Sequence, residues 1–98
     1  MKSILQKDTT KCFICGKNCN YDSLDKHHVF EGPYRSKSEK YGLFVFIHHN
    51  ECHIFGKNAV HVNAEIAHKL KKYAQIIAMK VYGWSVEEFI EKFGRSHI

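Results

Sequence analysis

The chain has 98 residues, which is enough for one domain but close to the size at which a hydrophobic core alone gives little stability. Its formal net charge of +5, counted with all eight histidines neutral, suits a polyanionic partner, although moderate positive charge also keeps proteins soluble. Residues 1–8 have no apolar run long enough for a secretion signal, and no stretch approaches membrane-spanning length. We therefore expect a cytoplasmic protein with no membrane partner, whose cysteines bind metal rather than form disulfides.

The first expected elements are a lead-in and a tight turn. Residues 1–11 are polar and show no sustained periodicity, which predicts a loosely held segment. Cys12-x-x-Cys15 followed by Gly16 has the form of a zinc knuckle, in which both thiolates point inward and the glycine takes a strained backbone position. The knuckle opens a segment, residues 12–62, that we expect to hold a hairpin and a metal site as well.

The hairpin is predicted from two short runs. Residues 26–30 end in Val-Phe and indicate a strand that places His27 and His28 on opposite faces. Residues 42–47 are apolar and partly β-branched, and they give the strongest strand prediction in the chain. Between the strands, residues 31–41 hold the only proline, two serines and three basic residues, which predicts a mobile basic loop.

Residues 63–98 are predicted to be helical, as part of one domain spanning 1–98. Residues 52–62 before them form either a short helical turn or a loop. Asn63 is a suitable N-cap, and Gly83 supplies a helix stop. The buried stripe of this first helix is expected at four positions spaced four, three and four apart: Ile66, Leu70, Tyr73 and Ile77. A second helix is expected to open with a capping box at 85–88, to end at Gly94 and to pack three aromatic residues into the core: Trp84, Phe89 and Phe93.

Histidine and cysteine are concentrated in one part of the chain, with seven of the eight histidines between residues 27 and 68. Neutral imidazole and thiolate are ligands of transition metals. A structural zinc site needs four nitrogen or sulfur ligands, usually supplied as two close pairs. We expect structural Zn²⁺ at Cys12, Cys15, His48 and Cys52, with His49 or Cys19 as alternatives to His48.

The same motifs resemble those of the HNH endonucleases, also known as ββα-metal or His-Me finger nucleases. The shared features are Cys-x-x-Cys, then His-His in a hairpin, then a downstream Cys-His. The likeness is greatest to small phage and prophage members, and it covers most of the chain from Cys12 onward. The most similar strings are residues 26–30, 38–43, 52–53, 56–57, 59–63 and 93–95. The resemblance implies an α+β, ββα-metal (HNH) fold with a zinc knuckle and C-terminal helices.

The resemblance also implies an activity, the metal-dependent hydrolysis of DNA phosphodiester bonds with Mg²⁺ or Mn²⁺. By resemblance, His27 is a ligand of the catalytic ion and His28 is the general base. His53 is then a second ligand, and His61 is either a third ligand or a histidine that contacts the phosphate. The chemistry supports this independently, because a histidine with its ordinary pKa of about 6.5 can accept a proton at neutral pH.

Basic residues near the histidines are expected to contact DNA phosphates. These residues are Arg35, Lys37, Lys40 and Lys57. The lysines of the first C-terminal helix are instead expected to form a solvated face.

One position departs from the family pattern. The family has an asparagine on the second strand, where it orients the base, but no asparagine occurs between residues 42 and 47. Asn50, Asn58, Asn63 or a backbone carbonyl would have to replace it. The departure supports a rival class, a non-catalytic zinc module that binds nucleic acid or protein, such as an accessory of a phage packaging machine.

Overall fold

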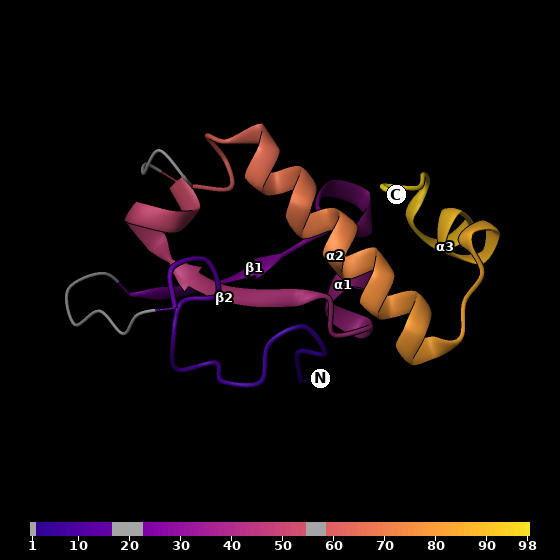
Figure 1. Cartoon of the computed structure of the whole chain (residues 1–98), viewed down its shortest axis with the longest axis horizontal. Coiled ribbons are helices and arrows are strands. Elements are labelled where there is room, and N and C mark those ends of the chain that lie inside the picture. The colour runs from indigo at the N-terminus through magenta and orange to yellow at the C-terminus, as the bar shows by residue number, and fades with distance from the viewer. Residues whose placement is uncertain (1, 17–22, 55–58) are drawn as a thin grey trace.

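The computed structural model describes residues 2–16, 23–54 and 59–98 (Figure 1). These residues form a small α+β domain with one two-stranded antiparallel sheet and three α-helices. The elements in chain order are β1 (Leu24–His28), a 3₁₀ turn η1 (Gly32–Tyr34), α1 (Arg35–Lys40), β2 (Phe44–His48), a π-helical turn η2 (His49–Ile54), α2 (Ala64–Tyr82) and α3 (Val86–Phe93).

The register of the hairpin decides which side chains share a face. Asp25 pairs with Ile47 and His27 pairs with Val45, so these four side chains lie on one face of the sheet. Val45 and Ile47 are fully buried in the core, together with residues of α2 and α3. Figure 1 shows α2 crossing the hairpin. The face that carries Asp25 and His27 is therefore the face that packs against the interior of the domain.

The prediction of a mobile loop at residues 31–41 is wrong, because this segment forms η1 and α1. Its Arg-Ser-Lys-Ser-Glu-Lys sequence has no apolar stripe, so hydrophobic periodicity gives no sign of a helix. The helix is held in place through Ser38, which is fully buried and donates its hydroxyl to the carbonyl of Leu43. A buried serine that bonds to the start of β2 takes the place of an apolar anchor.

The lead-in is also held more firmly than predicted. Ile4 donates its backbone N–H to the carbonyl of Gly42 at 2.9 Å. The backbone N–H of Phe46 in turn donates to Oε1 of Gln6 at 2.7 Å. This N-terminal segment thus covers backbone groups of β2 that β1 does not pair, and so protects an otherwise open sheet edge.

The helix boundaries follow the predicted caps. Oδ1 of Asn63 accepts hydrogen bonds from the backbone N–H groups of residues 65 and 66, and Gly83 ends α2 with φ of 69°. Ser85 and Glu88 form the predicted capping box of α3, which ends at Gly94. No helix among the described residues is both long enough and apolar enough to cross a membrane.

The buried face of α2 differs in part from the predicted stripe. Leu70 is buried, but Tyr73 is 40% exposed. The remaining buried positions of α2 are Ala74, Gln75 and Ala78. Ala74 and Ala78 are small, whereas the buried amide of Gln75 donates to Oγ of Ser96 and accepts from the backbone N–H of His97. Phe89 and Phe93 of α3 are buried and stack with ring centroids 4.9 Å apart, as expected of core residues.

Candidate functional site

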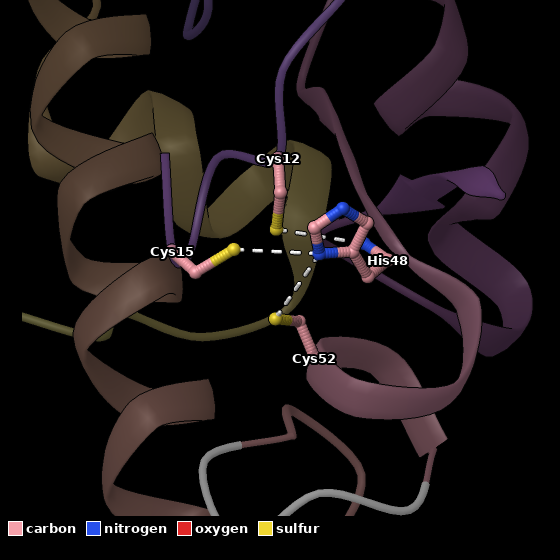
Figure 2. A group of neighbouring side chains, drawn as sticks. All are labelled: Cys12, Cys15, His48 and Cys52. Atoms are coloured by element: carbon pink, nitrogen blue, oxygen red, sulfur yellow. Dashed lines mark hydrogen bonds between the residues drawn. The ribbon is translucent and has the colours of Figure 1, made fainter. Parts of the chain in front are cut away.

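The first cluster joins three cysteines and one histidine from two parts of the chain that are distant in sequence (Figure 2). Cys12 and Cys15 come from the knuckle, His48 is the last residue of β2, and Cys52 lies in η2. Their four candidate ligand atoms all lie within 4.8 Å of one another. Nδ1 of His48 is 3.3 Å from Sγ of Cys15 and 3.9 Å from Sγ of Cys52.

Local backbone bonds bring the cysteines to the strand. Gly16 has φ of 74° and donates its N–H to the carbonyl of Cys12, which closes the knuckle turn. Phe13 donates its N–H to the carbonyl of Phe46 at 2.9 Å, which fixes the turn against β2. The predicted strained glycine is confirmed, since a positive φ of this size favours a residue without a side chain.

The electrostatics of this cluster favour a bound cation. Burial raises the pKa of the Cys52 thiol, and the neighbouring Cys12 and Cys15 raise it further. Burial opposes ionisation of Cys12 as well, but hydrogen bonds from the backbone N–H groups of Cys15 and His48 outweigh it and lower that pKa. Three adjacent thiols cannot all ionise without a compensating positive charge.

The imidazole of His48 points its Nδ1 toward the sulfur atoms (Figure 2). Its Nε2 is buried and has no hydrogen-bond partner among the described residues. Three thiols and one imidazole nitrogen are the donor set of a Cys₃His zinc site. Of the alternatives for the fourth ligand, His49 bonds to Asp25 instead, and Cys19 lies outside the described residues.

The second cluster brings together three histidines that the sequence predicted as ligands of a catalytic ion, His27, His53 and His61. Nε2 of His53 lies 3.2 Å from Nδ1 of His27 and 3.0 Å from Nε2 of His61. His61 is brought into place because its backbone N–H donates to the carbonyl of His53 at 3.1 Å. Two nitrogens bound at about 2.1 Å to one tetrahedral ion lie roughly 3.4 Å apart, so the separations of His53 from His27 and from His61 are close to those of shared ligands.

His27 is neutral at physiological pH. Its side chain is buried, and burial together with the nearby imidazoles of His53 and His61 lowers its pKa to about 3. A neutral imidazole keeps a lone pair on one ring nitrogen, as a metal ligand must.

A carboxylate lies behind the second cluster. Oδ2 of Asp25 is 2.9 Å from Nδ1 of His53 and also bonds to Nδ1 of His49. Burial alone would raise the pKa of Asp25, but these two hydrogen bonds outweigh it and lower the pKa. Because an ionised carboxylate only accepts, Nδ1 of His53 carries the proton, and its Nε2 lone pair faces His27 and His61.

His28 extends from the opposite face of β1, as predicted, yet it reaches the same pocket as His27. Nε2 of His28 lies 2.9 Å from Oε1 of Glu39, a residue of α1. The pocket has a volume of about 270 Å³, far more than the roughly 30 Å³ that one water molecule occupies in the liquid, so a phosphate group can enter. Its lining residues are Lys26, His27, His28, Glu31, Gly32, Arg35, His53 and His61.

The residues predicted to contact DNA differ in their partners and in their distance from the pocket. Arg35 is exposed and lines the pocket beside His28. The ammonium of Lys37 donates to the carbonyl of Lys92 at 2.9 Å, and that of Lys40 lies over the ring of Tyr41. Lys57 lies outside the described residues. Among the described members of the set, Arg35 is therefore best placed to meet a phosphate in the pocket.

Three carboxylates of this site were missed by sequence reasoning: Asp25, Glu39 and Glu31, whose Oε1 lies 3.9 Å from Nε2 of His27. Asp25 could have been found, because it is two residues from His27 and so shares its face of the strand. Glu39 lies within residues 38–43, one of the strings that resemble the HNH family, but its carboxylate was given no role because residues 31–41 were predicted to be a loop.

Comparison with protein-family models, with curated proteins and with solved structures gives no match to this chain. A β-hairpin followed by helices, with a Cys₃His cluster, agrees with the arrangement that the HNH resemblance implies. The resemblance itself rests on the sequence motifs.

Proposed function

We propose that the protein is a metal-dependent HNH-type endonuclease that nicks or cleaves DNA by hydrolysing phosphodiester bonds. One observation carries the proposal: three histidine nitrogens separated by 3.0 and 3.2 Å share a pocket with a fourth histidine, His28. The pocket also contains the cationic side chains of Lys26 and Arg35. Metal-assisted phosphodiester hydrolysis requires ligands for an ion, a general base and positive charge near the phosphate. This pocket offers imidazoles for the first two and cationic side chains for the third.

His27, His53 and His61 would hold the catalytic ion. When bound, a divalent ion at this position neutralises charge on the phosphate and on the departing oxygen. The donor set supports Mn²⁺ over Mg²⁺, because Mg²⁺ prefers oxygen ligands and gives up its waters reluctantly.

The remaining groups of the pocket have separate tasks. His28 accepts the proton of the attacking water, which a neutral imidazole can do at physiological pH. Arg35 binds the phosphate through its guanidinium group, which can donate two parallel hydrogen bonds. A structural Zn²⁺ at Cys12, Cys15, His48 and Cys52 would hold the knuckle and η2 to β2.

The test is a nicking assay on supercoiled plasmid with Mn²⁺ or Mg²⁺. We expect nicking by the native chain, and a rate lower by about 10²- to 10⁴-fold for His28→Ala. His68→Ala is the matched control, because His68 is an exposed histidine of α2 and does not line the pocket. Equal nicking by His28→Ala and the native chain would reject the assignment of the base.

The rival function is a non-catalytic zinc module that binds nucleic acid or protein, including an accessory of a phage packaging machine. The observation in its favour is that β2, Phe44–His48, carries no asparagine. Retained DNA binding without any nicking by the native chain in Mn²⁺ would support the module over the nuclease.

A further inference from the structure

His28 bonds to a carboxylate where the HNH resemblance leads one to expect an asparagine. Nε2 of His28 lies 2.9 Å from Oε1 of Glu39, and no residue of β2 provides an amide in this role. We infer that Glu39 is the positioning residue of His28, an inference that rests on the proposed nuclease function.

Glu39 is held in place by hydrogen bonds between its helix and the residues just before β2. It lies in α1, and its carbonyl accepts the N–H of Gly42 at 3.2 Å. The neighbouring Ser38 is fully buried, its carbonyl accepts the N–H of Leu43 at 2.8 Å, and its hydroxyl bonds to the carbonyl of the same residue. A carboxylate on an element anchored in this way can hold an imidazole in one orientation.

The hydrogen bond selects one tautomer of His28. A carboxylate can only accept, so Nε2 of His28 must donate, and Nδ1 is left with the lone pair. Hydrogen bonds from His28 and Lys26 lower the pKa of Glu39, which keeps it ionised. The ring of His28 also packs against the ring of Phe44, with centroids 5.9 Å apart. Glu39 and Phe44 therefore both hold this imidazole, and the hydrogen bond to Glu39 distinguishes its two nitrogens.

Glu39 has a second partner, and the test must separate the two. The ammonium of Lys26 lies 3.0 Å from Oε1 and 3.3 Å from Oε2 of the same carboxylate. A carboxylate that served only to hold Lys26 would act on DNA binding, whereas one that positions the base acts on the chemical step.

The kinetic experiment compares zinc-loaded chains that carry Glu39→Ala, Glu39→Gln, Lys26→Met or Glu91→Gln. We expect Glu39→Ala to lower kcat for nicking by about 10- to 100-fold with little change in KM. Glu39→Gln should recover part of this loss, because its amide oxygen still accepts from Nε2. Lys26→Met should act mainly on KM, and Glu91→Gln, at an exposed position of α3, should match the native chain. An unchanged kcat in Glu39→Ala, or the same loss of kcat in Lys26→Met, would overturn the inference.

A second measurement does not depend on activity. Nitrogen NMR of the imidazoles at pH about 8, where a histidine with an ordinary pKa of about 6.5 is neutral, reports the tautomer of each ring. The signals of His28 are identified by their loss in His28→Ala. We expect the Nε2–H form in the native chain and a mixture of tautomers in Glu39→Ala, whereas equal populations in both would overturn the inference. If the native chain does not nick DNA, the nuclease proposal fails, and the tautomer still decides whether Glu39 holds His28.

Discussion

At the scale of single residues, a carboxylate determines which nitrogen of a histidine is free to bind an ion. Asp25 accepts a hydrogen bond from the protonated Nδ1 of His53. The lone pair on Nε2 of His53 therefore faces the cluster with His27 and His61. A metal-binding histidine is commonly oriented by such a partner, and removing the partner weakens metal affinity.

We predict that Asp25→Ala lowers Mn²⁺ affinity by about 10- to 100-fold, because His53 is no longer held in one tautomer. Calorimetric titration of the zinc-loaded chain with Mn²⁺ measures this change. His49→Ala is the control, since it removes the other partner of Asp25 and leaves the bond to His53. Native affinity in Asp25→Ala would contradict this role.

The buried His27 predicts a pH dependence of stability. Its pKa in the folded chain is about 3, below the ordinary value of about 6.5, so the unfolded chain binds the proton first as the pH falls. The stability that depends on neutral His27 is fully present above pH ~6.5 and is lost as the pH falls toward 3. The loss is about 1.4 kcal/mol per pH unit within this range.

Denaturant unfolding of the native chain and of His27→Gln, both without the catalytic ion, checks this dependence. The free energy of unfolding of His27→Gln should fall less steeply with acid than that of the native chain. Loss of zinc at low pH affects both chains alike, so it cancels in the comparison. Parallel curves would show that His27 does not titrate in this way.

The sequence predicts the histidines better than their partners. His27, His53 and His61 stand out because histidine and cysteine are crowded around them, whatever the exact fold. Asp25 was overlooked because the strand was expected to begin at residue 26, whereas β1 begins at Leu24. The choice of His48 over His49 could not be made from spacing, because it depends on which face of β2 meets the knuckle.

At the scale of elements, the N-terminal segment and the turn before β2 support each other. Gly42 has φ of 73°, and a side chain there would place its Cβ 2.6 Å from the carbonyl of Lys2. The close approach accompanies the bond from the N–H of Ile4 to the carbonyl of Gly42. The N-terminal segment can therefore pack against this turn only if residue 42 has no side chain.

We predict that Gly42→Ala destabilises the protein more than Gly83→Ala does. Both glycines have positive φ, and this conformation alone costs an L-residue roughly 1–2 kcal/mol. A Cβ at Gly83 meets nothing within 4 Å, whereas one at Gly42 must also displace the N-terminal segment. Urea unfolding gives both free energies, and equal losses would contradict the extra cost at Gly42.

Elements with side-chain signatures were predicted, and those held by hydrogen bonds to the β2 region were not. The capping residues Asn63 and Ser85 marked α2 and α3 because a helix start needs particular side chains. The segment at residues 2–11 and helix α1 lack an apolar stripe. They are held by hydrogen bonds to the β2 region, and such bonds leave no periodic pattern in a sequence.

At the scale of the whole molecule, the Cys₃His cluster is the point where three parts of a small domain meet. It joins the knuckle to the end of β2 and to η2, which follows β2 directly but lies more than 30 residues from the knuckle in sequence. A domain of 98 residues has a limited core, so a metal crosslink of this kind contributes a large share of its stability.

We predict one Zn²⁺ per chain and a loss of cooperative folding when a strong chelator removes it. The free energy of a structural zinc site is largely free energy of folding, so Cys52→Ser should lose both zinc and native stability. Metal analysis and thermal unfolding followed by circular dichroism measure the two effects. Cys19→Ser is the control and should keep its zinc, because the four grouped residues already complete the ligand set. Zinc-free protein with native stability would contradict the prediction.

The adjacency of Cys52 and His53 in η2 has a thermodynamic consequence. One side chain belongs to the Cys₃His cluster and the next to the histidine cluster, so a single turn of backbone serves both. An ion that fixes this turn removes an ordering cost from the binding of the other ion. By reciprocity, each ion then raises the affinity for the other by the same factor. The two sites are therefore expected to fill cooperatively, and a chain that has lost its zinc should also bind the second ion weakly.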